Sequence, residues 1–220
     1  MRDLNQSIIK FNYDQNFTDD DFYVSKSNEH IFSLLNKWPK WHKNFLNIVG
    51  EKFSGKTHLS NIFIRKFKGI KLNSNSLKND DLKKIKIHEN IILEDLDKNI
   101  DEKLLYSLFN IVDLENKYII VTSNIPIVNI EFSLTDLKSR AKNFILQNIE
   151  KPDDNLIFAL ILKNLSDRQI LIDKKLIDFI IKRIHRSYSK IFDFIYKVDE
   201  LSLKKKKPID LKIIKEVLGE

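Results

Sequence analysis

Eight residues, Gly50 to Thr57, have the types and spacing of a phosphate-binding loop and match G-x-x-x-x-G-K-S/T completely. In such a loop the backbone N–H groups and the start of the next helix point at one place, where a di- or triphosphate binds. Lys56 would reach the terminal phosphates, and the Thr57 hydroxyl would hold Mg²⁺. The alternative is that these residues form an ordinary turn that binds no phosphate. Because the chain has only four glycines, two of them at the required positions favour nucleotide binding.

Polar side chains follow two later apolar runs and belong to the same chemistry. Ile91–Leu93 leads directly into Glu94 and Asp95. One carboxylate would complete the magnesium shell, and the next would position or polarise the attacking water. Asn124 follows a third buried run and would lie near the terminal phosphate. Acids after a strand are common in turns, so they carry weight only because they lie downstream of the loop.

Alternating buried strands and helices must position these groups. They predict a parallel sheet flanked by helices, with the ligand at the carboxyl ends of the strands. Beyond residue 151 only helical patterns follow, which predicts a small all-α lid. The expected parts are an N-terminal arm (1–21), an α/β nucleotide-binding domain (22–150) and a helical lid domain (151–220). We expect strands at 46–49, 69–72, 91–95, 118–122 and 144–146, and lid helices at 155–165, 173–184, 187–201 and 210–218.

Within the arm, Gln6, Ile9 and Phe11 place a glutamine, an aliphatic residue and an aromatic residue at fixed offsets. A short extended peptide of this kind suits a groove, with apolar side chains in pockets and the glutamine amide hydrogen-bonded at one end. A first strand or a disordered tail explains the same residues, and from the residues alone that explanation is favoured.

Composition narrows the class of protein. The net charge of +7 over 220 residues invites nucleic-acid binding, but the tetralysine Lys204–Lys207 is typical of a solvated linker as well as of a DNA contact. The chain contains no cysteine, which excludes disulfides and thiolate metal sites. It has neither a signal peptide core nor a stretch of about 18 apolar residues. We therefore expect a cytoplasmic protein without a membrane partner.

The order of these parts resembles the AAA+ ATPase module of the bacterial replication initiator DnaA, and more closely the family of short DnaA-related regulators called Hda. The resemblance covers about residues 6 to 203. It is carried by Phe22-Tyr23-Val24, Asn28, the loop through Leu59, Glu94-Asp95, Thr122-Ser123-Asn124-Ile125-Pro126 and Leu137-Lys138-Ser139-Arg140.

The resemblance implies a clamp-tethered regulator that contacts an ATP-loaded initiator and supplies an arginine finger to it, which Arg140 matches. Partners would be DnaA and the DNA polymerase sliding clamp, which the peptide at Gln6, Ile9 and Phe11 would bind. DNA contact would be indirect, and a homo-oligomer is compatible. The implied cofactors are ADP or ATP with Mg²⁺, the metal held by Thr57 and Glu94. The implied nucleotide-binding residues are Phe22, Val24, Gly50, Ser54, Gly55, Lys56, Thr57, His58 and Arg186, with Asp95, Asn124 and Arg140 in catalysis.

Two residues depart from the family's pattern. Glu94 stands where the family usually has aspartate, and Ser189 stands where the lid arginine is expected, with Arg186 or Lys190 as substitutes. Both changes favour weak intrinsic hydrolysis. The leading alternative is a helicase-loader-like or DNA-remodelling ATPase, for which Lys204–Lys207 would contact DNA. A small-molecule kinase is a third possibility, although no second-substrate motif is evident.

Overall fold

The computed structural model describes residues 22–220, so the peptide residues Gln6, Ile9 and Phe11 lie outside the described part of the chain. Its centre is a five-stranded parallel sheet with the order β2-β3-β4-β1-β5. Because β1 lies between β4 and β5 whereas β2 lies at the far edge, the carboxyl end of β1 borders the crevice where ligands bind in such sheets. The strands are β1 Phe45–Val49, β2 Ile70–Asn73, β3 Asn90–Leu96, β4 Tyr118–Ser123 and β5 Ile145–Asn148.

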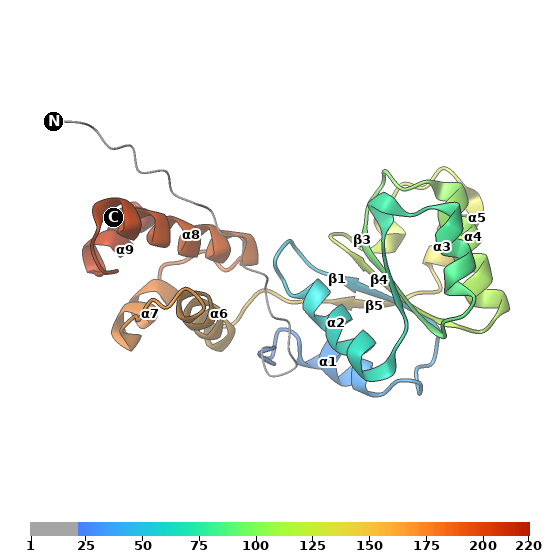
Figure 1. Ribbon diagram of the computed structural model, residues 1–220, viewed down its shortest axis with the longest axis horizontal. Helices are drawn as coiled ribbons and strands as arrows, with labels where there is room; N and C mark the ends of the chain where they lie inside the picture. Colours follow the sequence, from blue (N-terminus) through green and yellow to red (C-terminus); the bar gives the residue numbers. More distant parts are fainter. Residues whose placement is uncertain (1–21) are drawn as a thin grey trace.

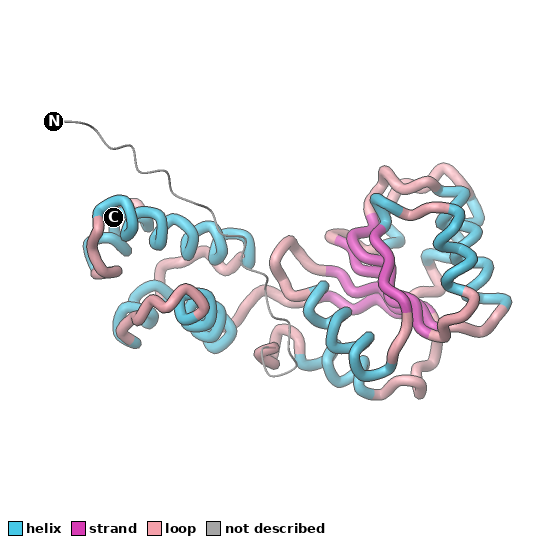
Figure 2. The backbone as a smooth tube through the Cα atoms, in the orientation of Figure 1, coloured by secondary structure: helices cyan, strands magenta, loops and turns pink. Residues whose placement is uncertain are grey.

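Helices cover both faces of the sheet, as Figures 1 and 2 show. Successive residues of the central strands alternate between two cores: Ile91 and Leu93 join the core under α3, α4 and α5, whereas Ile92 joins the core under α1 and α2. The strands therefore read as continuous apolar runs, because each is buried on both sides. These helices are α1 Glu29–Asn36, α2 Lys56–Phe67, α3 Asn79–Ile85, α4 Glu102–Leu114 and α5 Thr135–Ala141.

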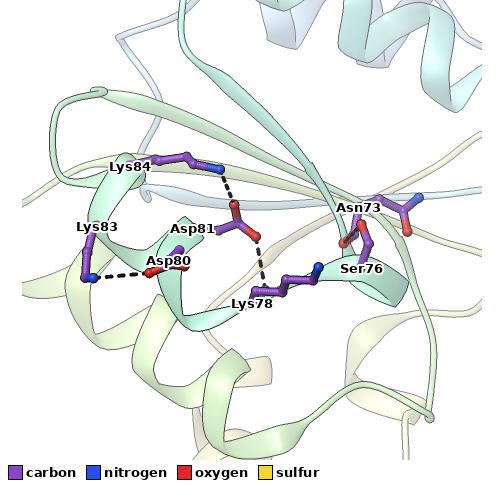
Figure 3. A network of polar contacts seen from close by, with 7 residues as sticks. All are labelled: Asn73, Ser76, Lys78, Asp80, Asp81, Lys83 and Lys84. Atoms are coloured by element: carbon purple, nitrogen blue, oxygen red, sulfur yellow. Dashed lines mark hydrogen bonds and ion pairs between the residues drawn. The ribbon is translucent and has the colours of Figure 1, made fainter.

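A polar segment after β2 turns the chain back beside the sheet edge. It forms a short 3-10 helix, η2 (Ser74–Ser76), before α3. The Lys78 N–H donates to Asp81 Oδ2 at 3.0 Å, and Lys84 Nζ donates to Asp81 Oδ1 at 2.8 Å, as Figure 3 shows. These contacts, led by the Lys84 hydrogen bond, lower the pKa of the Asp81 carboxyl. They fix the start of α3.

The chain beyond β5 folds into helices that share a core of their own, formed by Ile161, Ile180, Ile195 and Ile213 among others. The helices are α6 Asp154–Ser166, α7 Lys174–Ile181, α8 Tyr188–Lys205 and α9 Leu211–Leu218. The predicted fold class, a parallel sheet flanked by helices and followed by an all-α lid, is confirmed. None of the helices within residues 22–220 is long and apolar enough to cross a membrane.

The lid helix α8 is longer than its sequence pattern indicates. The expected end was near Leu201, but the helix continues to Lys205 and ends at Lys206, whose φ is 51°. Lysine is a good helix former, and no glycine or proline intervenes before Pro208. Half of the tetralysine is therefore helical, and all four of its residues are exposed.

Candidate nucleotide-binding site

The loop after β1 favours glycine at two positions, for lack of space at one and for its backbone conformation at the other. A Cβ atom on Gly50 would lie 2.4 Å from Ser54 Oγ. Gly55 is the N-cap of α2 and has a φ of 96°, in the left-handed region that favours glycine. The Ser54 hydroxyl is buried and has no hydrogen-bond partner among residues 22–220. This is the backbone arrangement in which loop N–H groups and a helix N-terminus are available to a phosphate.

Lys56 lies at the centre of the site, only 6% exposed. Its ammonium donates to Gly50 O at 2.7 Å, Glu51 O at 3.0 Å and Asn124 Oδ1 at 3.1 Å. Burial lowers the pKa of the ammonium, an effect that the carboxylates of Asp95 and Glu51 oppose. A buried cation whose donors meet neutral oxygens is a strong attractor for an anion. The structure thus brings the predicted residues Lys56 and Asn124 into contact.

Asp95 reaches the cavity because β3 is irregular at its end. The pairing of β3 with β4 shifts register between Leu93 and Leu96, and Asp95, inside the shift, has a φ of 56°. Its N–H donates to Thr122 Oγ1 at 3.1 Å, and Asn73 Nδ2 donates to its carboxylate at 3.4 Å. The carboxylate is exposed and lines the cavity, where it can act as a base toward a water molecule.

A buried asparagine supports the segment that carries Asn124, and sequence reasoning missed it. Asn47, in the middle of β1, is fully buried. Its amide donates to Val121 O at 3.0 Å and Ser123 Oγ at 2.9 Å, and it accepts from the Ile127 N–H at 2.9 Å. These bonds hold the chain on both sides of Asn124 against β1. A polar residue inside an apolar strand was the available signal.

Glu94 is the residue that could hold a cation. It is buried, and its Oε2 atom lies 3.3 Å from Lys71 Nζ, which also donates to Asn61 Oδ1 at 2.8 Å. Its Oε1 atom has no hydrogen-bond partner among the described residues. Residues 22–220 contain no cluster of three or more His, Cys, Asp or Glu side chains that could hold a metal. Mg²⁺ usually needs only one or two protein ligands, with water and phosphate supplying the others. The Oε1 atom of Glu94 offers one such ligand, although Glu94 itself is not among the residues that line the nucleotide cavity.

Aromatic side chains close one end of the loop. The Phe22 ring meets His58 edge-on with centroids 5.1 Å apart and stacks on Phe32 at 5.9 Å. A Cβ atom on Gly55 would lie 3.4 Å from the Phe22 ring. Phe22 and His58 therefore both lie at the loop, but His58 lines the cavity whereas Phe22 does not. Val24 is exposed and is not among the residues that line the cavity.

The cavity itself has a volume of about 610 Å³ and lies between the phosphate loop and the lid, a size that suits a nucleotide. Of the predicted residues it is lined by Ser54, Gly55, Lys56, Thr57, His58, Asp95 and Asn124. The carboxyl end of helix α6 faces the loop, so the lid also lines the cavity. Nothing in the sequence indicates this packing, and the lid residues were therefore not predicted. The missed lining residues include Asn75, Asp97, Lys163, Asn164, Asp167 and Phe192.

Arg186 is not brought to the cavity. Its guanidinium donates to Asp154 Oδ1 at 2.6 Å, at the start of α6, and both side chains are at least half exposed. Lys190, the other candidate for the lid's cation, is also absent from the cavity lining. Neither side chain is placed to contact a phosphate in this conformation.

Arg140 lies on the surface of α5, away from the chain's own cavity lining. Its guanidinium donates to Asp113 Oδ2 at 3.2 Å and to Asn110, both on α4, and lies 5.7 Å from the centre of the Tyr106 ring. The side chain is 25% exposed. Arg140 is thus held at the molecular surface by the neighbouring helix rather than directed at the loop.

Comparison with solved structures identifies the fold. Domain III of the Thermotoga maritima replication initiation protein DnaA superposes with a TM-score of 0.72 at 18% identity, covering 92% of this chain and 95% of that chain. The AMPPCP-bound DnaA of Aquifex aeolicus gives a TM-score of 0.66 at 19% identity, covering 86% of this chain and 69% of that one. The fold is that of DnaA domain III.

The sequence comparison agrees with this fold. The chromosomal replication initiator protein DnaA of Buchnera aphidicola subsp. Cinara cedri is 25% identical to the chain, over 90% of the chain and 52% of that protein. The chain therefore spans about half the length of the curated relative that it matches. No protein-family model matches the sequence. The chain is similar to DnaA in sequence and has the fold of DnaA domain III.

Proposed function

We propose that this protein binds ADP or ATP in the cavity between the phosphate loop and the lid. The observation that carries the proposal is the buried ammonium of Lys56, which joins the loop to Asn124 and donates to three neutral oxygens within residues 22–220. The bound analogue AMPPCP in the Aquifex aeolicus DnaA structure supports nucleotide binding by this fold. Phe22 and His58 would contact the base at the other end of the loop.

Thr57 and Glu94 would hold Mg²⁺, which supplies charge neutralisation for the phosphates. Replacing Glu94 with glutamine is expected to weaken Mg²⁺ binding to the ADP complex at least about tenfold, since a carboxylate ligand is lost. A magnesium titration of ADP binding measures this. The control is Asp97→Asn, which removes a carboxylate that lines the nucleotide cavity. Equal Mg²⁺ affinity in wild type and Glu94→Gln would remove Glu94 from the metal site.

The cellular role that we propose is regulation of replication initiation. The protein would contact ATP-loaded DnaA and place Arg140 at the initiator's nucleotide, where a guanidinium stabilises charge on the transferring phosphoryl group. Support comes from the DnaA-like fold and from the position of Arg140, which is held at the surface and outside the chain's own cavity. Phosphate release by the initiator, with this protein and DNA-loaded clamp present, tests the proposal.

Clamp tethering through the N-terminal peptide is a separate part of the proposal. The double substitution of Gln6 and Phe11 by alanine is expected to abolish clamp binding, since it removes the amide and the aromatic group that would fill the groove. Binding of the protein to clamp immobilised on a surface measures the affinity. The expected melting temperature is unchanged, and Asn5→Ala serves as the control. Clamp binding that survives the double substitution would rule out this peptide.

A DNA-remodelling ATPase is the alternative, and one observation favours it: Lys204–Lys207 are all exposed at the end of α8. It predicts DNA binding that weakens steeply with salt and falls when these lysines are neutralised. If folded protein fails to stimulate the initiator but binds DNA in this way, the alternative replaces the regulator.

A further inference from the structure

Glu51, the second residue of the phosphate loop, does not line the nucleotide cavity. Its carboxylate instead meets the first residues of the lid helix α8. Ser187 Oγ donates to Oε2 at 3.1 Å, the Ser189 N–H donates to Oε1 at 3.3 Å, and the Tyr188 N–H also donates to Oε1. These partners are 136 to 138 positions away in the sequence. The loop thus supplies three acceptor contacts to another part of the fold.

The contact is a helix cap provided from outside the helix. The first N–H groups of an α-helix have no partner within it, and a negative charge there is favourable. Ser187, the N-cap residue of α8, makes no side-chain cap of its own. Glu51 fills this role with a charged acceptor, which forms stronger hydrogen bonds than a neutral one.

Neighbouring loop residues reinforce the same junction. The Phe53 ring stacks on Phe192 of α8 with centroids 4.8 Å apart, and Ser189 Oγ donates to Lys52 O at 3.4 Å. Three successive loop residues, Glu51 to Phe53, therefore contact the first two turns of α8.

We propose that Glu51 is a positioning residue that attaches the lid helix α8 to the phosphate loop and so holds Phe192 of the lid against Phe53 of the loop at the wall of the nucleotide cavity. The inference deepens the proposed nucleotide-binding function and rests on it. Because Phe53 and Phe192 both line the cavity, a looser junction should weaken the binding of ADP and of ATP.

The first test concerns the attachment and needs no nucleotide. Glu51→Ala is expected to raise hydrogen exchange at the Tyr188 and Ser189 amides at least about tenfold, because charge-assisted bonds that limit local opening are lost. Glu51→Gln, which keeps an acceptor, should give a smaller increase. Unchanged hydrogen exchange at the amides that pair β3 with β4 would show that the fold of the variant is intact. The control Glu150→Gln removes an exposed carboxylate near the same junction. Unchanged exchange in Glu51→Ala would overturn the attachment.

The second test concerns the nucleotide. Because the junction holds Phe53 and Phe192 together at the cavity wall, Glu51→Ala should weaken the binding of ADP and of ATP, each by about two- to fivefold. The control Glu150→Gln should leave both affinities unchanged. Affinities of Glu51→Ala equal to those of wild type would overturn the role at the cavity. If the folded wild type binds neither nucleotide, the proposed function fails, whereas the exchange measurement still decides whether Glu51 attaches the lid.

Discussion

Lys56→Ala is expected to abolish the stabilisation of the protein by ADP. At a ligand concentration of 100 times Kd, binding stabilises a fold by about 2.7 kcal/mol, which for a chain of this size raises the melting temperature by roughly 5–10 °C. Removal of the ammonium deprives the phosphate site of the buried positive charge that Lys56 supplies. Thermal unfolding with and without ADP and Mg²⁺ measures the effect.

The comparison must use the shift caused by ADP rather than the melting temperature itself. Lys56 also donates to Gly50 O, Glu51 O and Asn124, so the substitution changes the stability of the ligand-free fold as well. Lys66→Ala is the matched control, because Lys66 lies on the same helix but pairs with Asn36 at the surface. An undiminished ADP shift in Lys56→Ala would contradict the assignment of the phosphate loop.

The sheet could be predicted from the sequence because its signals are local. Each central strand is buried on both faces, so Ile91–Leu93 and Tyr118–Thr122 are unbroken apolar runs with turn residues at their ends. The phosphate loop is equally local, since two glycines and a lysine at fixed spacing specify its backbone. Once the strands are parallel, their carboxyl ends must share one edge. The contact between Lys56 and Asn124 follows from that rule.

The remaining features depend on contacts between residues that are distant in the sequence. Nothing near Glu51 indicates that its carboxylate caps a helix more than 130 positions away. The lid residues that line the cavity face it because α6 packs beside the phosphate loop. From the sequence alone, the polar face of a helix is normally expected to be exposed to solvent. Arg186 illustrates the same difficulty, because its ion pair with Asp154, 32 positions earlier, could not be predicted from the sequence.

Arg140→Ala is expected to reduce the stimulation of phosphate release from the ATP-bound initiator by about 10³-fold or more, which is what an arginine supplied in trans contributes in related phosphoryl transfers. The measurement compares wild type and variant at saturating amounts of this protein, with DNA-loaded clamp. Lys138→Ala is the matched control, a substitution on the same helix that leaves Arg140 and its partners in place. ADP binding by the variant itself should be unchanged, because Arg140 does not line its own cavity.

The competing explanation is that Arg140 only fastens α5 to α4 through Asp113 and Asn110. The two roles predict different results. A partly exposed ion pair contributes about 0–1 kcal/mol, so a purely structural arginine would lower the melting temperature slightly and leave the stimulation intact. Asp113→Asn distinguishes the structural role from the action on a partner, because it weakens the contact between α5 and α4 but leaves the Arg140 guanidinium in place. If Arg140 acts on a partner, Asp113→Asn should retain most of the stimulation that Arg140→Ala loses. If both variants lost the same amount of stimulation, the ion pair between Arg140 and Asp113 would be required, and the argument that Arg140 acts on the initiator's phosphate would fail.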